Sequence, residues 1–265
     1  MRGRNKTKRE QGRTSRGRIA VAAAAGIVIA TALVGGLILW SSFSGGGSDG
    51  PKTAVIVDQL SLTEPNPAFA EQVRNMLGQA GYLVDDFEGK EVTVEFYSSL
   101  PLRDYDVVIL RVHSGLTEVW GEATDYISLF TGEPYDDTKY TDAEDAGLVG
   151  AATYYRGGES VFGISPDFIA SGMFGRFHGT TVIMMGCDGL TYDSAAQAFI
   201  RKGAKVVFGW RGRVSAEHTD AATERLLQHL LVEKRTAREA AALTMEEVGP
   251  DPDYGSELLA YPNKG

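Results

Sequence analysis

Two short apolar runs limit what this chain can fold into, because each is too short for a buried helix. The first, residues 105–112, leads directly into His113-Ser-Gly115. The second, residues 181–186, leads into Cys187. Runs of this length that are rich in Val, Ile, Leu and Met are typical of buried strands. Since the carboxyl ends of parallel strands meet at one edge of a sheet, we expect His113 and Cys187 to lie close together.

The rest of the body alternates between strand and helix patterns. This alternation predicts an α/β fold with a mainly parallel open sheet flanked by helices. Thr236 and Glu239 have the spacing of a capping box at the start of the last helix. The expected strands are 53–58, 82–84, 92–96, 107–112, 182–185 and 204–209, and the expected helices are 67–81, 165–171, 192–202, 215–232 and 236–247.

Residues 116–160 interrupt this rhythm. Within them, 126–131 and 149–155 are expected to pair as antiparallel strands. The intervening segment, 132–147, is rich in Asp, Glu, Thr and Tyr. Such a segment is typical of an exposed excursion, and its place in the chain puts it near the edge of the sheet that carries His113.

The N-terminal region has the pattern of a membrane anchor. Residues 1–18 hold eight Lys or Arg and one acid, and residues 19–40 hold no charge. At about 1.5 Å per residue, 22 helical residues span roughly 33 Å, enough for a bilayer core. The pattern predicts a single-pass helix with a cytoplasmic basic tail and an extracytoplasmic body. A cleaved signal peptide is the alternative, although its apolar region is normally about 7–15 residues.

A flexible Gly/Ser linker, 41–51, separates this helix from the body, 52–265. The chain holds 26 Lys and Arg and 35 Asp and Glu. Since eight basic residues and one acid precede residue 19, the remainder carries 18 basic and 34 acidic side chains, a net charge of −16. A body this acidic repels phosphates, so we expect no nucleic-acid partner.

Cys187 is the only cysteine, so the chain forms no intramolecular disulfide. A lone cysteine is often a buried and inert core residue. Cys187, however, follows a strand and lies between Gly186 and Gly189. This position favours a nucleophile, and His113 at the neighbouring strand end is the natural base for it.

The order of these motifs resembles the caspase-hemoglobinase fold. This clan of cysteine peptidases includes caspases, legumain, gingipains, clostripain and separase. In that family a histidine follows the third core strand and a cysteine the fourth, as with His113-Ser-Gly115 and Gly186-Cys187-Asp-Gly189 here. Residues 198–210 are also similar to the segment after the cysteine in bacterial members, including the CHAT domains. The resemblance covers residues 53–245.

The resemblance implies a cysteine endopeptidase that needs no cofactor and acts on a peptide or protein. Cys187 would be the nucleophile and His113 the general acid/base. The backbone N–H groups of Gly115 and Cys187 would stabilise the oxyanion. The sheet edge would accept a substrate strand. The residues expected to wall the pocket for the side chain before the scissile bond are Asp188, Trp210, Arg211 and Arg213.

One departure from the family concerns specificity. Relatives that cut after basic residues carry an acid where this chain has Met185. With Arg211 and Arg213 nearby, this predicts an electropositive pocket that disfavours Lys and Arg, although Asp188 acts in the opposite sense. The alternative is that the two arginines belong to a solvated basic loop.

Other functions remain open at this stage. His113 would be a structural histidine in a catalytically silent binding module of the same fold. Alternatively, Cys187 would pair with His218 in another α/β cysteine hydrolase or amidotransferase. His178, at the opposite end of the cysteine strand, is interpreted as structural, and His229, in the middle of a helix, as a surface residue.

Five of the acids in the 116–160 excursion lie between residues 136 and 145. They are interpreted as part of a solvated loop. Calcium, which some relatives bind, is the alternative, although the spacing does not fit an EF-hand loop. These acids are Asp136, Asp137, Asp142, Glu144 and Asp145.

Overall fold

The structure, a computed structural model, describes residues 50–119, 122–154 and 158–262. Residues 50–265 form one compact unit. The expected basic tail, membrane-spanning helix and linker, at 1–18, 19–40 and 41–51, fall outside the described residues apart from the last two linker positions. Within the described ranges no helix has the length and apolar character needed to cross a membrane.

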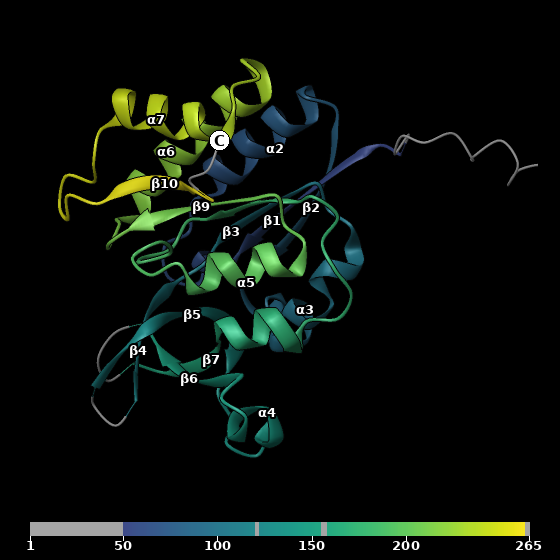
Figure 1. The fold of residues 1–265 in the computed structure, drawn as a ribbon, viewed down its shortest axis with the longest axis vertical. Coiled ribbons are helices and arrows are strands. Elements are labelled where there is room, and N and C mark those ends of the chain that lie inside the picture. Colours follow the sequence, from purple (N-terminus) through teal and green to yellow (C-terminus); the bar gives the residue numbers. More distant parts are fainter. Residues whose placement is uncertain (1–49, 120–121, 155–157, 263–265) are drawn as a thin grey trace, which may run out of the picture. The chain divides into compact units, whose positions relative to one another are not determined.

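The main sheet of the body has six strands. Figure 1 shows it between two layers of helices. Its strand order is β10-β9-β8-β3-β1-β2. All neighbours pair in parallel except β10, which is antiparallel to β9. The mainly parallel α/β sheet expected from the sequence is therefore confirmed. The strands are β1 (Lys52–Asp58), β2 (Tyr82–Glu88), β3 (Val107–Arg111), β8 (Thr181–Met184), β9 (Val206–Arg211) and β10 (Glu257–Tyr261).

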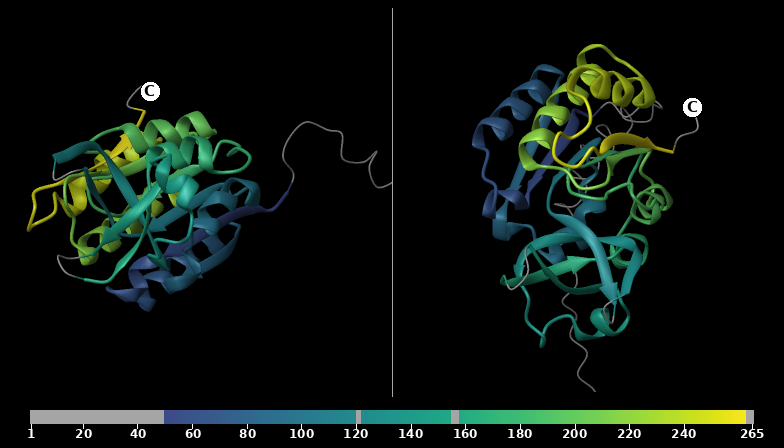
Figure 2. Two further views of the ribbon diagram at one scale, coloured as in Figure 1. Left: turned by 90° about the horizontal axis from the view of Figure 1, so that it is seen from below. Right: turned by 90° about the vertical axis from the view of Figure 1, so that its left-hand side faces the viewer.

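Helices cover both faces of this sheet (Figures 1 and 2). Alternate residues of the central strands enter two separate cores, so that Val108 packs on one side and Ile109 on the other. This explains why the strands read as continuous apolar runs rather than alternating ones. One face is covered by α2 (Pro67–Gln79), α6 (Ala216–Leu227) and α7 (Ala237–Val248), and the other by α3 (Val94–Ser99) and α5 (Ser194–Lys202).

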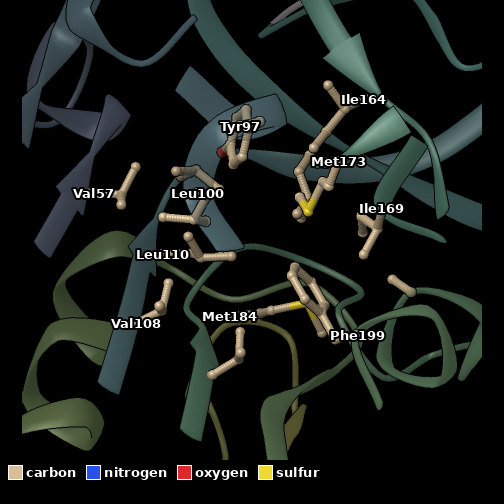
Figure 3. Packing of buried hydrophobic residues seen from close by; sticks show 14 of the residues in the cluster. Val57, Tyr97, Leu100, Val108, Leu110, Ile164, Ile169, Met173, Met184 and Phe199 are labelled. Atoms are coloured by element: carbon tan, nitrogen blue, oxygen red, sulfur yellow. The ribbon is translucent and has the colours of Figure 1, made fainter. Parts of the chain in front are cut away.

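A second, four-stranded antiparallel sheet packs beyond α3 and α5 on the same side of the main sheet (Figures 1 and 2). Its order is β4-β5-β7-β6, and Ile164 joins it to the core around Tyr97 and Phe199 that is drawn in Figure 3. The strands are β4 (Ser114–Val119), β5 (Glu122–Pro134), β6 (Val149–Thr153) and β7 (Ser160–Ile164), with α4 (Thr141–Asp145) between β5 and β6.

The expected pairing of 126–131 with 149–155 was wrong. Both segments form strands, β5 and β6, but each pairs with β7 instead of with the other. β7 was not predicted from the sequence, and it lies between β5 and β6 in the order of the small sheet. β4, β10 and the short helix α4 were not predicted either.

The strand expected at 92–96 was also wrong, because the chain forms α3 there. Thr93 caps this helix, and its hydroxyl accepts a hydrogen bond from Phe96 N at 3.0 Å. The expected last helix is present as α7, and its capping box is confirmed by Thr236–Glu239 hydrogen bonds in both directions.

Short turns complete the fold: 3₁₀ helices η1 (Gln59–Leu62), η2 (Gly89–Glu91) and η3 (Leu100–Arg103), and π-helical turns η4 (Phe168–Gly172) and η5 (Gln228–Val232).

Gly203 ends α5 with a positive φ of 113°, and a Cβ atom there would lie 2.1 Å from the carbonyl oxygen of Phe177. We expect Gly203→Ala to lower the free energy of unfolding by more than about 1 kcal/mol, because both the backbone and the space are incompatible with a side chain. Gly78→Ala in α2, where a Cβ atom meets nothing within 4 Å, is the control and should raise it by about 0.5–1 kcal/mol. Urea unfolding of the full-length protein measures both, and equal effects would contradict the prediction.

Candidate active site

A cavity of about 670 Å³ opens at the carboxyl ends of the parallel strands, and both His113 and Cys187 line it. The end of β6 and the start of α6 complete its walls, together with the segment after β1. The cavity therefore lies where open parallel sheets usually bind ligands. Its lining includes apolar side chains such as Leu60, Phe130 and Val214.

The pairing of β3 with β8 brings the two residues to this cavity. Leu110 of β3 lies opposite Met184 of β8. His113 comes three residues after Leu110, and Cys187 three residues after Met184. The chain therefore leaves β3 and β8 at the same level of the sheet. The Ser114 hydroxyl donates a hydrogen bond of 2.6 Å to the carbonyl oxygen of Cys187 and ties the two strand ends together.

Only glycine fits before Cys187. A Cβ atom on Gly186 would lie 2.3 Å from Ser114 Oγ and 2.4 Å from the carbonyl oxygen of Val112. The glycine therefore permits the close approach of the histidine and cysteine segments. The sequence feature that singled out Cys187, a glycine beside the thiol, has this packing cause.

His113 is held on three sides. Its N–H donates to Gln59 Oε1 at 2.9 Å, and its carbonyl oxygen accepts from Phe130 N at 2.9 Å. Its imidazole Nε2 is 2.8 Å from Thr63 Oγ1, and the ring packs on that of Tyr154 with centroids 4.9 Å apart. Nδ1 has no hydrogen-bond partner among the described residues. When the Thr63 hydroxyl accepts from Nε2–H, Nδ1 becomes the basic nitrogen.

Burial, assisted by the positive charge of Arg111, lowers the pKa of His113 to about 4. The imidazole is therefore uncharged at neutral pH. Burial disfavours the charged form of Cys187 as well, and for a thiol this raises the pKa above its usual range. A hydrogen bond from Val214 N to Sγ at 3.5 Å only partly opposes this rise. The resting site thus holds a neutral thiol and a neutral imidazole, and no hydrogen bond joins them in the described part of the chain.

The residues expected to line the substrate pocket divide into two groups. Gly115, Asp188 and Arg213 line the cavity, and the guanidinium of Arg213 lies 4.6 Å from the centroid of the Tyr254 ring. The cavity lining does not include Trp210 or Arg211.

Each of these two residues has a structural partner elsewhere. The buried Trp210 donates from its indole N–H to Thr219 Oγ1 at 2.9 Å, and Arg211 pairs with Glu257 at the surface.

This arrangement removes the basis for an electropositive pocket. Only one of the two loop arginines reaches the cavity. Among the described residues, three carboxylates line the same cavity as Arg213, namely Glu64, Asp188 and Glu217.

The other three histidines are not among the residues that line the cavity. His218 Nε2 is 3.1 Å from the carbonyl oxygen of Gly249, so its ring joins α6 to the end of α7. His178 forms an exposed pair with Asp104 at 2.7 Å. The expectation of a surface position for His229 was wrong, because η5 extends α6 beneath α7 and leaves this side chain only 2% exposed.

The acids of the excursion do not converge. Asp136 accepts hydrogen bonds from the N–H and hydroxyl groups of Thr138, and Glu144 accepts one from Tyr135. Among the described residues, no group of three or more His, Cys, Asp or Glu side chains is arranged to hold a metal ion.

Sequence reasoning missed the residues that orient His113. Gln59 and Thr63 follow β1 directly, so the rule that strand ends share one edge contained a signal for them. Tyr154 gave no such signal, because it depends on the small sheet, whose pairing was not predicted.

No family model and no curated protein matches this sequence.

His113 should make stability depend on pH. Its folded pKa of about 4 lies below the ordinary value of 6.5. The unfolded chain therefore takes up the proton first, and the stability that His113 contributes is complete above about pH 6.5 and is lost as the pH falls towards 4. We expect His113→Gln to remove about 2–3 kcal/mol of the stability lost between pH 7 and pH 4. Urea unfolding of the full-length protein at both pH values measures this, and parallel losses in the two proteins would contradict it.

Proposed function

We propose that the body, residues 52–265, is a cysteine endopeptidase of the caspase-hemoglobinase fold. The observation that carries the proposal is one cavity lined by both Cys187 and His113. The order of the motifs supports it as well. Along the chain, His113 follows β3, the third strand of the main sheet, and Cys187 follows β8, the fourth.

The neutral pair sets the order of proton transfers. As Cys187 Sγ attacks the substrate carbonyl carbon, His113 takes the thiol proton, and the backbone N–H groups of Gly115 and Cys187 stabilise the oxyanion. The imidazolium then protonates the leaving amine, and the C–N bond breaks. His113 next deprotonates a water molecule as it attacks the acyl-enzyme, and the imidazolium returns this proton to Sγ as the C–S bond breaks, which frees the carboxylic acid and regenerates the thiol.

This proposal competes with the two other readings of the sequence. The position of His218 on the carbonyl oxygen of Gly249, outside the cavity lining, disfavours a dyad of Cys187 with His218. A silent binding module would keep the same fold and cavity, but it would not depend on the chemistry of Cys187. Reactivity of the thiol towards a substrate-like electrophile therefore separates the two.

We expect the full-length protein to react with a thiol-directed peptide electrophile, and Cys187→Ser to abolish the reaction. His113→Ala should lower peptide turnover by about 10²–10⁴-fold, because the thiol then lacks its base. His178→Ala, which removes an exposed histidine, is the matched control and should leave turnover unchanged. Full turnover in His113→Ala would refute the dyad, and loss in His218→Ala instead would favour the rival hydrolase.

We further propose that residues 19–40 cross the membrane and leave the body outside the cytoplasm, with residues 1–18 inside. The charge difference across this segment supports that orientation.

Protease added to intact cells should therefore digest the body and spare an epitope placed in the basic tail. The reverse pattern, a body protected until the cells are lysed, would contradict the orientation.

A further inference from the structure

Arg111, the last residue of β3, is 1% exposed and lies two residues before His113. Its three guanidinium nitrogens all donate hydrogen bonds, to partners at the end of β1, in α6 and in the segment after β1. Nη1 donates to Asp58 Oδ1 at 2.8 Å, and Nε and Nη2 donate to the two oxygens of Asp220 at 2.8 and 2.9 Å. Nη2 also donates to the carbonyl oxygen of Glu64 at 2.8 Å.

These bonds fix the segment 59–66 at both of its ends. At its start, the Asp58 carboxylate accepts from Ser61 N at 2.9 Å. At its end, Asn66 Nδ2 donates to Asp220 Oδ2 at 2.9 Å. The segment held in this way carries Gln59 and Thr63, the two side chains that hydrogen-bond His113.

We propose that Arg111 is a positioning residue for His113: by joining Asp58, Asp220 and the Glu64 carbonyl, it fixes the segment that holds the imidazole in the cavity. The inference deepens the proposed function and rests on it, since it assumes that His113 is the general base.

A contribution to stability alone does not explain why these three charges are buried. Taking them out of water offsets much of their mutual attraction, and a protein with apolar residues of similar volume in their place is often just as stable. A role in geometry accounts for such a triad beside the cavity. Arg111 also acts directly on the imidazole, because its charge adds to burial in lowering the pKa of His113.

Other groups share the cavity with the imidazole. The charged or titratable groups that line it with His113 are Glu64, Tyr154, Cys187, Asp188, Arg213, Glu217 and Tyr254. None of them is changed in the experiment below, so a change in the titration of His113 reports on the triad.

The main variant of the full-length protein combines Arg111→Met with Asp58→Asn and Asp220→Asn, which removes the three charges together and leaves none unpaired. The chain has four histidines, so NMR of protein with ¹³C-labelled histidine follows each imidazole, and His113→Gln assigns the signal of His113. Turnover and thermal unfolding are measured on the same samples. Arg74→Met, which removes an exposed arginine paired with Asp86, is the matched control.

We expect the triple variant to fold, its turnover to fall by about 10²-fold, and the His113 titration midpoint to rise, because the positive charge that helps to lower the His113 pKa is gone. Arg111→Lys keeps a buried charge but lacks the planar fork of donors, so its turnover should fall by about 10-fold and the midpoint should rise less. If the triple variant does not fold, the turnover and the His113 midpoint of Arg111→Lys test the role of Arg111 in its place.

Two results overturn the inference. One is a folded variant with wild-type turnover and a wild-type His113 midpoint. The other is lost turnover with an unchanged midpoint, which is what a purely structural role gives. Failure of the proposed function is distinct, because the unmodified protein would then cleave nothing, while the midpoint of His113 still reports whether the charge of Arg111 acts on the imidazole.

Discussion

The parallel pairing of β3 with β8 is the interaction on which the site depends. Because Leu110 lies opposite Met184, the chain leaves both strands at one level, and His113 and Cys187 follow at equal distances. A shift of the register by one residue would turn the side chains of either strand to the opposite face. Gly186 and the hydrogen bond from Ser114 to the Cys187 carbonyl oxygen then hold the two strand ends in contact.

The rest of the fold surrounds this junction. The small antiparallel sheet begins at Ser114, immediately after His113, and returns Phe130 to the His113 carbonyl oxygen and Tyr154 to its ring. The segment after β1 covers the ring from another side through Thr63. Burial of this kind disfavours the charged imidazole and the thiolate, so the proposed reaction begins from a neutral pair.

Short sequence patterns, such as an apolar run or a capping box, correctly predicted β3, β8 and α7. The apolar runs before His113 and Cys187 are strands because they are buried on both faces, and the capping box of α7 forms where Thr236 predicted it. The pattern failed at 92–96, where a strand-like run has a capping residue, Thr93, that starts α3. Short strands such as β7 carry too little pattern to be recognised alone.

Contacts between distant segments explain the remaining failures. Arg111 gave no signal as part of the site, because its partner Asp220 is 109 residues away and becomes visible only when α6 packs on the sheet. The family resemblance implied that Trp210 and Arg211 wall the pocket, but they are the last two residues of β9. Their places are set instead by Thr219 and by Glu257 of β10, a strand that the pattern did not reveal.

The proposed dyad can be tested by a crystal structure of the full-length protein after reaction with a peptide electrophile. We expect a covalent bond from Cys187 Sγ to the electrophile, with the peptide in the cavity and a nitrogen of His113 within about 3.2 Å of the atom that stands for the leaving amine. The adduct oxygen should face the N–H groups of Gly115 and Cys187. An adduct on another residue, or one on Cys187 with His113 turned away from it, would refute the Cys187–His113 dyad.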